Sequence, residues 1–259
     1  MSSLLTAVEG ETRRWTLNRP EARNALSAEL VDRLLEAAAA AAADRNCRVV
    51  VLDAAGTVFC AGSDVAALAS LSAPDAVAHE SRWPLLRDAF ASVDAPIVAS
   101  VRGAAVGGGL MLLLFTDVRV CEARTFFALP EVSLGWLPPG GLEELIAEIG
   151  VARARRLVLL GKRWRAADAL AAGIVDEVAA AGELETRVAE AARYLTSLPQ
   201  ASAASAKRYF RSRSGSAAAL DRLQLDEFAR CLETPEAVRS LRRFASGATR
   251  SVAPGRPTS

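Results

Sequence analysis

The segment PIVASVRGAAVGGGLMLLLFTDVRV, residues 96–120, contains the pattern that decides the fold. Residues 96–101 form a short, continuous apolar run, which is typical of a β-strand buried on both faces. A glycine-rich segment follows at 103–109, and an apolar helical stretch continues from it through Phe115. Another short strand is expected at 117–120. Strand, glycine loop, helix and strand in this order predict an α/β fold with parallel strands.

The residues before this segment show the same order of elements. We expect a strand at Thr12–Leu17, then a helix that Ser27 caps and that ends near Ala43, and then a buried strand at 48–53. The sequence Phe59-Cys60-Ala61-Gly62-Ser63-Asp64 follows and leads into a helical stretch. The α/β pattern therefore begins near the N-terminus.

The chain is mostly helical after Gly140. Helix patterns cover residues 151–160, 166–172, 182–198, 201–211 and 216–231. Pro199 interrupts this series, so we predict an α/β core at 1–198 and a C-terminal helical region at 199–250. The last residues, 251–259, are predicted to form a disordered tail.

Composition excludes several classes of function. The 259 residues carry 31 Lys+Arg against 30 Asp+Glu, so no basic excess is available for a nucleic-acid backbone. His79 is the single histidine, which excludes a multi-histidine site, and we expect no metal. The longest apolar run, 103–115, is too short for a membrane span, and the N-terminus lacks a signal-peptide pattern. We therefore predict a cytoplasmic protein without membrane or nucleic-acid partners, whose four scattered cysteines stay reduced.

The two glycine-containing loops, 59–64 and 103–109, are candidate binding elements. Each precedes a helix, whose first N–H groups lack partners within the helix and whose dipole is positive at that end. Two such loops facing each other would hold one oxyanion between two amides. The alternative is that the glycines only permit tight turns or close packing of helix on strand. Neither loop matches a dinucleotide fingerprint or a P-loop.

Several motifs resemble, in order, those of the enoyl-CoA hydratase/isomerase (crotonase) family. Leu17-Asn18-Arg19-Pro20 with Asn24-Ala25-Leu26-Ser27 resembles its N-terminal motif, and the loops at 59–64 and 103–109 resemble its two oxyanion loops. Phe127-Ala128-Leu129-Pro130-Glu131, followed by Gly140-Gly141, resembles its acid/base segment. The resemblance covers about residues 4–180.

The resemblance implies a crotonase-like spiral of ββα units with a C-terminal helical region that builds a homotrimer or hexamer. It also implies an acyl-CoA thioester substrate, with coenzyme A as part of that substrate and no separate cofactor. The backbone N–H groups of Ser63 and Gly108 would hold the thioester oxygen and stabilise an enolate. The residues that would line the CoA and acyl path are Arg23, Asn24, Ala25, Leu26, Ala61, Gly62, Asp64, Val65, Ala66, Met111 and Trp136. The candidates for binding the CoA 3′-phosphate are Arg23, Arg242 and Arg243.

Two positions bear on the reaction. The family's hydratases resemble one another in having two glutamates, whereas this chain has Glu131 at one position and Met111 at the other. Syn addition of water needs groups that activate the water and manage the second proton, and Met111 can transfer none. A single carboxylate can move a proton from C2 to C4 of a 3-enoyl thioester, as in the Δ3,Δ2-enoyl-CoA isomerases that this chain resembles. Our first hypothesis is therefore an isomerase with Glu131 as the acid/base.

Two alternatives stay open. One is a hydratase or dehydratase that uses Glu131 alone, in a secondary pathway or on a carrier-protein thioester. The other is a non-catalytic accessory subunit that binds acyl-CoA. A dienoyl-CoA isomerase is disfavoured because Pro139 stands where that branch has an Asp, and a dehalogenase because no Asp stands at or near Trp136.

Three further residues are expected to be mainly structural. His79 is interpreted as a partly exposed helix residue that lies on the stretch covering the acyl pocket. Glu143 and Glu144 would stabilise the start of the helix after Gly140-Gly141 through its dipole. The depth of the acyl pocket is expected to depend on residues 70–90, the least patterned part of the core.

Overall fold

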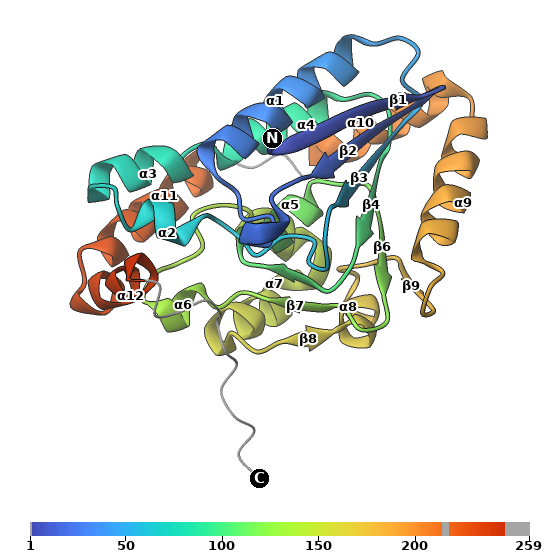
Figure 1. Ribbon diagram of the computed structural model, residues 1–259. Helices are drawn as coiled ribbons and strands as arrows, with labels where there is room; N and C mark the ends of the chain where they lie inside the picture. The colour runs from blue at the N-terminus through green and yellow to red at the C-terminus, as the bar shows by residue number, and fades with distance from the viewer. Residues whose placement is uncertain (1, 214–217, 247–259) are drawn as a thin grey trace.

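A six-stranded sheet forms the centre of the fold (Figure 1). The computed structural model describes residues 2–213 and 218–246. The strands of this sheet, in spatial order, are β1 (Leu4–Glu9), β2 (Thr12–Leu17), β3 (Val49–Ala54), β4 (Ile97–Val101), β6 (Val118–Glu122) and β9 (Glu177–Ala179). The β1–β2 pair is antiparallel and every other neighbouring pair is parallel. The predicted α/β fold with parallel strands is confirmed.

The central strands are buried on both faces because helices cover both. Val50 and Leu52 of β3 belong to the main core, which lies against α1 (Ala28–Ala43) and α4 (Trp83–Ser92). Val49 and Val51 point the other way, into a smaller core against α9 (Leu184–Ser197). Alternate side chains of one strand thus enter two cores, which explains the continuous apolar runs.

A second sheet of three strands carries the loop that the sequence analysis treated as irregular. Its strands are β5 (Ala104–Val106), β7 (Phe126–Ala128) and β8 (Trp164–Arg165). β5 lies inside the segment 103–109, so that segment is a strand followed by a helix start rather than a loop throughout. Cys60 also forms a bridge with Ala105, which ties the first glycine loop to this sheet.

The remaining helices of the core surround these two sheets. They are α2 (Val65–Leu68), α3 (Ala73–Glu80), α5 (Gly108–Leu114), α6 (Glu131–Leu134), α7 (Leu142–Leu160) and α8 (Ala166–Ala172), with a 3₁₀ turn at Pro20–Ala22. Ser27 caps α1 as predicted, because its hydroxyl accepts a hydrogen bond from the Leu30 N–H at 3.3 Å. Gly150, at φ +74°, kinks α7.

The C-terminal helices fold back onto the same chain. They are α10 (Gln200–Arg213), α11 (Ala218–Leu232) and α12 (Pro235–Ala245). Figure 1 places α11 and α12 beside α2 and α3, and Phe228 of α11 packs in one cluster with Leu68 and Ala76. The predicted boundary after residue 198 stays a prediction, and the predicted tail at 251–259 lies outside the described residues.

Two further expectations concern cysteines and membranes. Cys47, Cys60 and Cys121 are buried free thiols, and Cys231 is half-buried and also free, as expected for reduced cysteines. Within residues 2–213 and 218–246, no helix combines the length and the apolar character that crossing a membrane requires.

Candidate active site

The two glycine loops meet at the starts of α2 and α5. The Cys60 N–H donates to the Ala104 carbonyl at 3.1 Å, and the Val106 N–H donates to the Cys60 carbonyl at 3.0 Å. A Cβ placed on Gly108 would lie 3.3 Å from the Ser63 nitrogen. Neither the Ser63 nor the Gly108 N–H donates to another backbone group within the described part of the chain. The fold therefore brings together the two amides that the sequence analysis selected.

Glu131 lies directly beside these amides. It is the first residue of α6, its side chain is buried, and it is 7% exposed. A Cβ placed on Gly107 would lie 2.7 Å from the Oε1 atom of Glu131, and Gly107 has a φ of +56°. Glycine is therefore the residue that suits this position of the loop, where the backbone lies against the carboxyl group. Its Oε2 atom has no hydrogen-bond partner within the described residues. A buried, unpaired carboxyl oxygen beside two unpaired amides is the arrangement expected of an acid/base residue.

Burial changes the acidity of Glu131. Removal from water raises the pKa of its carboxyl group to about 8. A hydrogen bond from its own backbone N–H acts in the opposite direction, and repulsion from Glu80 raises the pKa further. Near neutral pH the carboxyl group is therefore held mostly protonated, and it can exchange its proton within the ordinary working range of an enzyme.

A second carboxyl group, that of Glu80, reaches the same region from the end of α3. It is 2% exposed. Its Oε2 atom accepts hydrogen bonds from Trp83 Nε1 at 2.7 Å and from Ser63 Oγ at 3.2 Å, and its Oε1 atom lies 3.2 Å from His79 Nδ1. Neither Glu80 nor Trp83 was expected from the sequence to be a functional residue, although His79 was expected on this covering stretch. The only signal was the spacing of Glu80 and Trp83, three residues apart.

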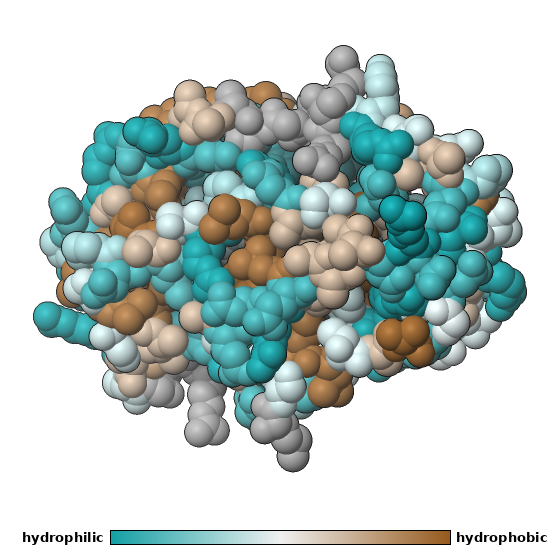
Figure 2. Space-filling model, turned by 90° about the horizontal axis from the view of Figure 1, so that it is seen from above, coloured by the Kyte–Doolittle hydropathy of each residue, from teal (hydrophilic) through white to brown (hydrophobic). Residues whose placement is uncertain are grey.

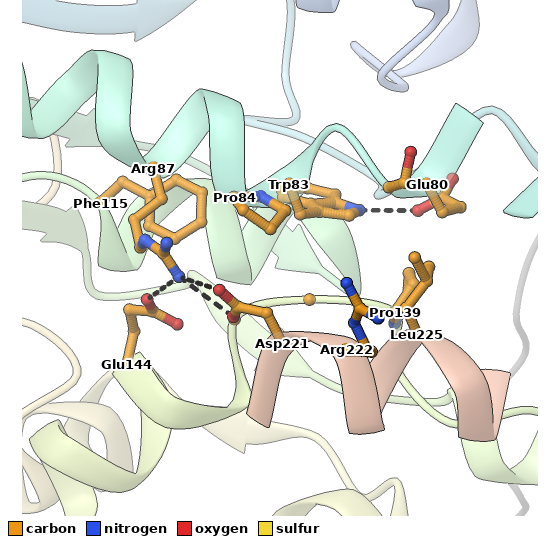
Figure 3. A pocket seen from close by; sticks show the side chains of 13 residues that line it. Glu80, Trp83, Pro84, Arg87, Phe115, Pro139, Glu144, Asp221, Arg222 and Leu225 are labelled. Carbon is orange, nitrogen blue, oxygen red and sulfur yellow. Dashed lines mark hydrogen bonds and ion pairs between the residues drawn. The ribbon is translucent and has the colours of Figure 1, made fainter. Parts of the chain in front are cut away.

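A cavity of about 140 Å³ runs from Glu80 along α4 and α7 to α11 (Figure 3). Trp83, Phe115 and Leu225 supply apolar surface. At the other end Arg87 pairs with Asp221 at 3.1 Å and with Glu144 at 3.4 Å. Glu144 belongs both to this cluster and to the first turn of α7. Its pKa is raised mainly because burial removes the carboxyl group from water.

Comparison with known proteins identifies the family. A family model described as enoyl-CoA hydratase/isomerase matches residues 12–245, which is most of the chain. The chain belongs to the enoyl-CoA hydratase/isomerase, or crotonase, family. As a member of this family it is an enzyme, and the family implies an acyl-CoA substrate.

Relatives and solved structures that resemble this chain support the same family assignment. A "Probable enoyl-CoA hydratase, mitochondrial" of Dictyostelium discoideum is 33% identical over 195 residues, which are 74% of this chain and 69% of the relative. The 2,3-dehydroadipyl-CoA hydratase of Escherichia coli (strain K12) is 36% identical over 179 residues, 69% of each chain. A crystal structure of an enoyl-CoA hydratase from Mycobacterium avium subsp. paratuberculosis K-10 superposes with a TM-score of 0.84 at 28% identity and covers 93% of this chain and 98% of that one. The crotonase fold with C-terminal helices is thus confirmed.

The crotonase N-terminal motif serves here to hold the loops together. Asn24 is fully buried, accepts a hydrogen bond from the Arg19 N–H at 2.8 Å, and donates to the Ala55 and Val58 carbonyls. Arg19 also pairs with Asp64 at 2.9 Å, and Asp64 caps α2. The side chains of Asn24 and Asp64 are therefore engaged within the protein, and binding of CoA at these positions would use the backbone.

Two other predicted residues are buried and do not line the cavity. Met111 is buried and packs on Gly141, since a Cβ there would lie 2.5 Å from its sulfur atom, and it does not itself line the cavity. Trp136 is buried in the cluster of Leu68, Phe228 and their neighbours, between the core and the C-terminal helices.

The remaining predicted residues lie at the surface or beside the loops. Leu26 is buried and bridges Ser63, and Gly62 is also buried. The side chains of Ala25, Ala61 and Val65 are half-buried, and those of Arg23 and Ala66 are exposed. Arg242 and Arg243 are exposed in the last turn of α12.

Proposed function

We propose that this enzyme adds water across the double bond of a 2-enoyl-CoA thioester, with Glu131 as an acid/base residue. The buried Glu131 carboxyl group beside the Ser63 and Gly108 amides is the observation that carries this proposal. The names of the relatives, at 33 to 36% identity, favour hydration over the double-bond shift that we expected first. The hydratase alternative of the sequence analysis thus becomes the leading proposal.

The geometry suits enolate chemistry. The Ser63 and Gly108 N–H groups would donate to the thioester oxygen, which draws electron density out of the conjugated double bond and makes C3 electrophilic. When water bonds to C3, negative charge builds on that oxygen, where the amides stabilise it. The attacking water loses one of its protons to a base at the site, and Glu131 gives its own proton to C2, which completes the hydration product.

Isomerisation of a 3-enoyl-CoA is the second candidate, and Met111 favours it. That side chain is buried and apolar at the position where the family's hydratases have a glutamate. A Glu131 carboxylate would take a proton from C2 and return it to C4 without any water. Both reactions use the same amides and the same carboxyl group, so only the products separate them.

The acyl group would enter the cavity between Trp83 and Leu225. The thioester lies at the Glu80 end in this proposal, because Glu80 contacts Ser63. The CoA portion would follow the backbone of 23–26 and 61–66. Its 3′-phosphate would meet Arg23, Arg242 or Arg243.

Assembly into a homotrimer or hexamer remains a proposal. Large hydrophobic residues are exposed on helices α7, α9 and α10, namely Val151, Leu159, Leu160, Tyr194 and Phe210. Figure 2 shows hydrophobic residues at the surface that is seen from above, where they gather in a hollow bordered by hydrophilic ones. Burial of such residues between copies would stabilise an oligomer. Analytical ultracentrifugation tests it: a monomer mass at micromolar concentration would contradict the proposal.

One experiment separates the two candidate reactions. Purified protein is offered crotonyl-CoA and 3-hexenoyl-CoA in parallel. Rapid formation of 3-hydroxybutyryl-CoA supports hydration, whereas conversion of 3-hexenoyl-CoA to the 2-enoyl product without hydration of crotonyl-CoA supports isomerisation. Glu131→Gln should abolish either reaction and leave binding of butyryl-CoA intact.

A further inference from the structure

Glu80 is a buried carboxyl group that the proposed chemistry has not yet used. Its two oxygens offer about four acceptor positions, and Trp83, Ser63 and His79 occupy three of them when His79 donates. One position is left for a further donor. Glu80 also lines the cavity, so a small molecule in the cavity would lie beside this carboxyl group (Figure 3).

The contacts of Glu80 place it beside the two unpaired amides. Ser63, whose hydroxyl donates to Glu80, also supplies one of the two unpaired amides. The indole of Trp83 lies against Gly108, since a Cβ there would be 2.7 Å from the ring. Glu80 is therefore linked to both amides through its own hydrogen-bond partners, while Glu131 reaches them through Gly107.

Resting on the proposed hydration, we propose that Glu80 is a second catalytic residue, which holds the attacking water and takes a proton from it. The oxygen of the water bonds to C3 as one of its O–H bonds breaks, and that proton goes to the Glu80 carboxylate. The electrons of the C2–C3 bond move toward the thioester oxygen, and C2 then takes the proton of Glu131. After the reaction Glu80 carries a proton and Glu131 does not, and proton exchange with solvent restores the starting state of both carboxyl groups.

The electrostatics of the pair fit this division of roles. Burial raises the pKa of Glu131 to about 8, so this carboxyl group carries a proton to donate at neutral pH. Repulsion from Glu80 contributes to that rise. Two neighbouring carboxyl groups in different environments are a recurrent means of providing one acid and one base. Glu80 would thus supply what Met111 lacks.

The opposing interpretation is that Glu80 only anchors Trp83 and the Ser63 loop. Glu80→Gln separates the two interpretations, because the amide oxygen can still accept from Trp83 and Ser63 but cannot take a proton from water. Glu80→Asp keeps a carboxylate. Glu143→Gln is a matched control, since Glu143 is a half-buried glutamate in the first turn of α7 that does not line the cavity.

Two reactions are measured on each variant: hydration of 2-enoyl-CoA thioesters of several chain lengths, and exchange of the C2 protons of butyryl-CoA with deuterium oxide. Exchange needs the amides and Glu131 but adds no water. Glu80→Gln should lower hydration about 10²- to 10⁴-fold while exchange continues. Its exchange rate should also rise at a lower pH than in the unsubstituted protein, because Glu131 loses a repelling neighbour. Glu80→Asp should recover part of the hydration, and Glu143→Gln should resemble the unsubstituted protein.

Failure of the proposed role of Glu80 and failure of the proposed hydration would give different results. Normal hydration by Glu80→Gln overturns the role of Glu80 and leaves the proposed hydration standing. Equal losses of hydration and exchange would mean that Glu80 only positions the Ser63 loop, which also overturns its catalytic role. Absence of hydration in the unsubstituted protein, at every chain length, overturns both proposals.

Discussion

Replacing Glu131 by Gln should stabilise the protein at alkaline pH while it removes activity. The reason is that the folded chain buries this carboxyl group and so resists its ionisation. Below about pH 4.5 the group is protonated in both the folded and the unfolded chain, and stability is unaffected. As the pH rises toward 8, the unfolded chain releases the proton and the folded chain retains it, so the free energy of unfolding falls. Above 8 both states are ionised and the full cost is present.

The size of the effect follows from the two pKa values. The pKa rises from 4.5 in the unfolded reference to about 8 in the folded protein. Each unit corresponds to about 1.4 kcal/mol, so the carboxyl group should cost roughly 5 kcal/mol above pH 8 and about 4 kcal/mol between pH 5 and pH 9. A glutamine side chain does not ionise in this pH range, so the variant does not carry this cost.

Urea unfolding at several pH values between 5 and 9 measures this cost. The free energy of unfolding of Glu131→Gln should exceed that of the unsubstituted protein by an amount that grows with pH, and Glu143→Gln should show no such growth. If the difference between the protein and Glu131→Gln is constant over this range, Glu131 does not have a raised pKa, and the reasoning that makes it an acid at neutral pH is refuted.

Three further changes test other parts of the structure. Gly108→Ala should lower hydration about 10²- to 10³-fold, because the new Cβ would lie 2.7 Å from the Trp83 ring and displace the amide; kcat/KM for crotonyl-CoA measures it, and unchanged activity would contradict the geometry. Asn24→Ala should destabilise the fold by about 2–3 kcal/mol in urea unfolding, since it leaves buried carbonyl groups unpaired; a loss below 0.5 kcal/mol would be inconsistent with its buried bonds. Arg87→Ala should destabilise the fold by about 3 kcal/mol, because Glu144 loses the cation that it pairs with. Thermal unfolding near neutral pH should show a lower Tm, and an unchanged Tm would contradict a stabilising role of this ion pair.

The fold was largely predictable where one strand or helix carries its own signal. Val49–Ala54 and Ile97–Val101 are mostly apolar and lack an alternating pattern because both faces of the sheet are covered. α1 was predictable because Ser27 caps it and its leucines recur on one side. In each case residues close in sequence determine the element.

The elements that were missed depend on distant partners. In β1 only Leu4 is buried, so Leu4–Glu9 has no alternating pattern, and its pairing with β2 makes it a strand. β5, β7 and β9 have three residues each, too few for a period. α12 is an exception: it packs on α2 and α6, far away in sequence, but Thr234 caps it and its apolar residues recur on one face, so this helix was missed although local signals mark it.

The candidate site also contains residues that local sequence marks and one that it does not. Ser63, Gly108 and Glu131 could be predicted because helix starts, glycines and a matched motif mark them. Glu80 could not, because its role depends on α3 folding back over the Ser63 loop, and nothing around it in sequence resembles a catalytic motif. No carboxylate stands at Met111, but absence at one position in the sequence does not exclude a carboxylate that comes from another element, as Glu80 does beside Ser63.

The central claim is that Glu131, beside the Ser63 and Gly108 amides, moves the proton in hydration of a 2-enoyl-CoA. The most direct measurement is the kcat for crotonyl-CoA hydration by the unsubstituted protein and by Glu131→Gln, with butyryl-CoA binding measured on both. The account predicts hydration by the protein, a loss of about 10²-fold or more in the variant, and equal binding. Hydration at the same rate by both proteins would contradict it.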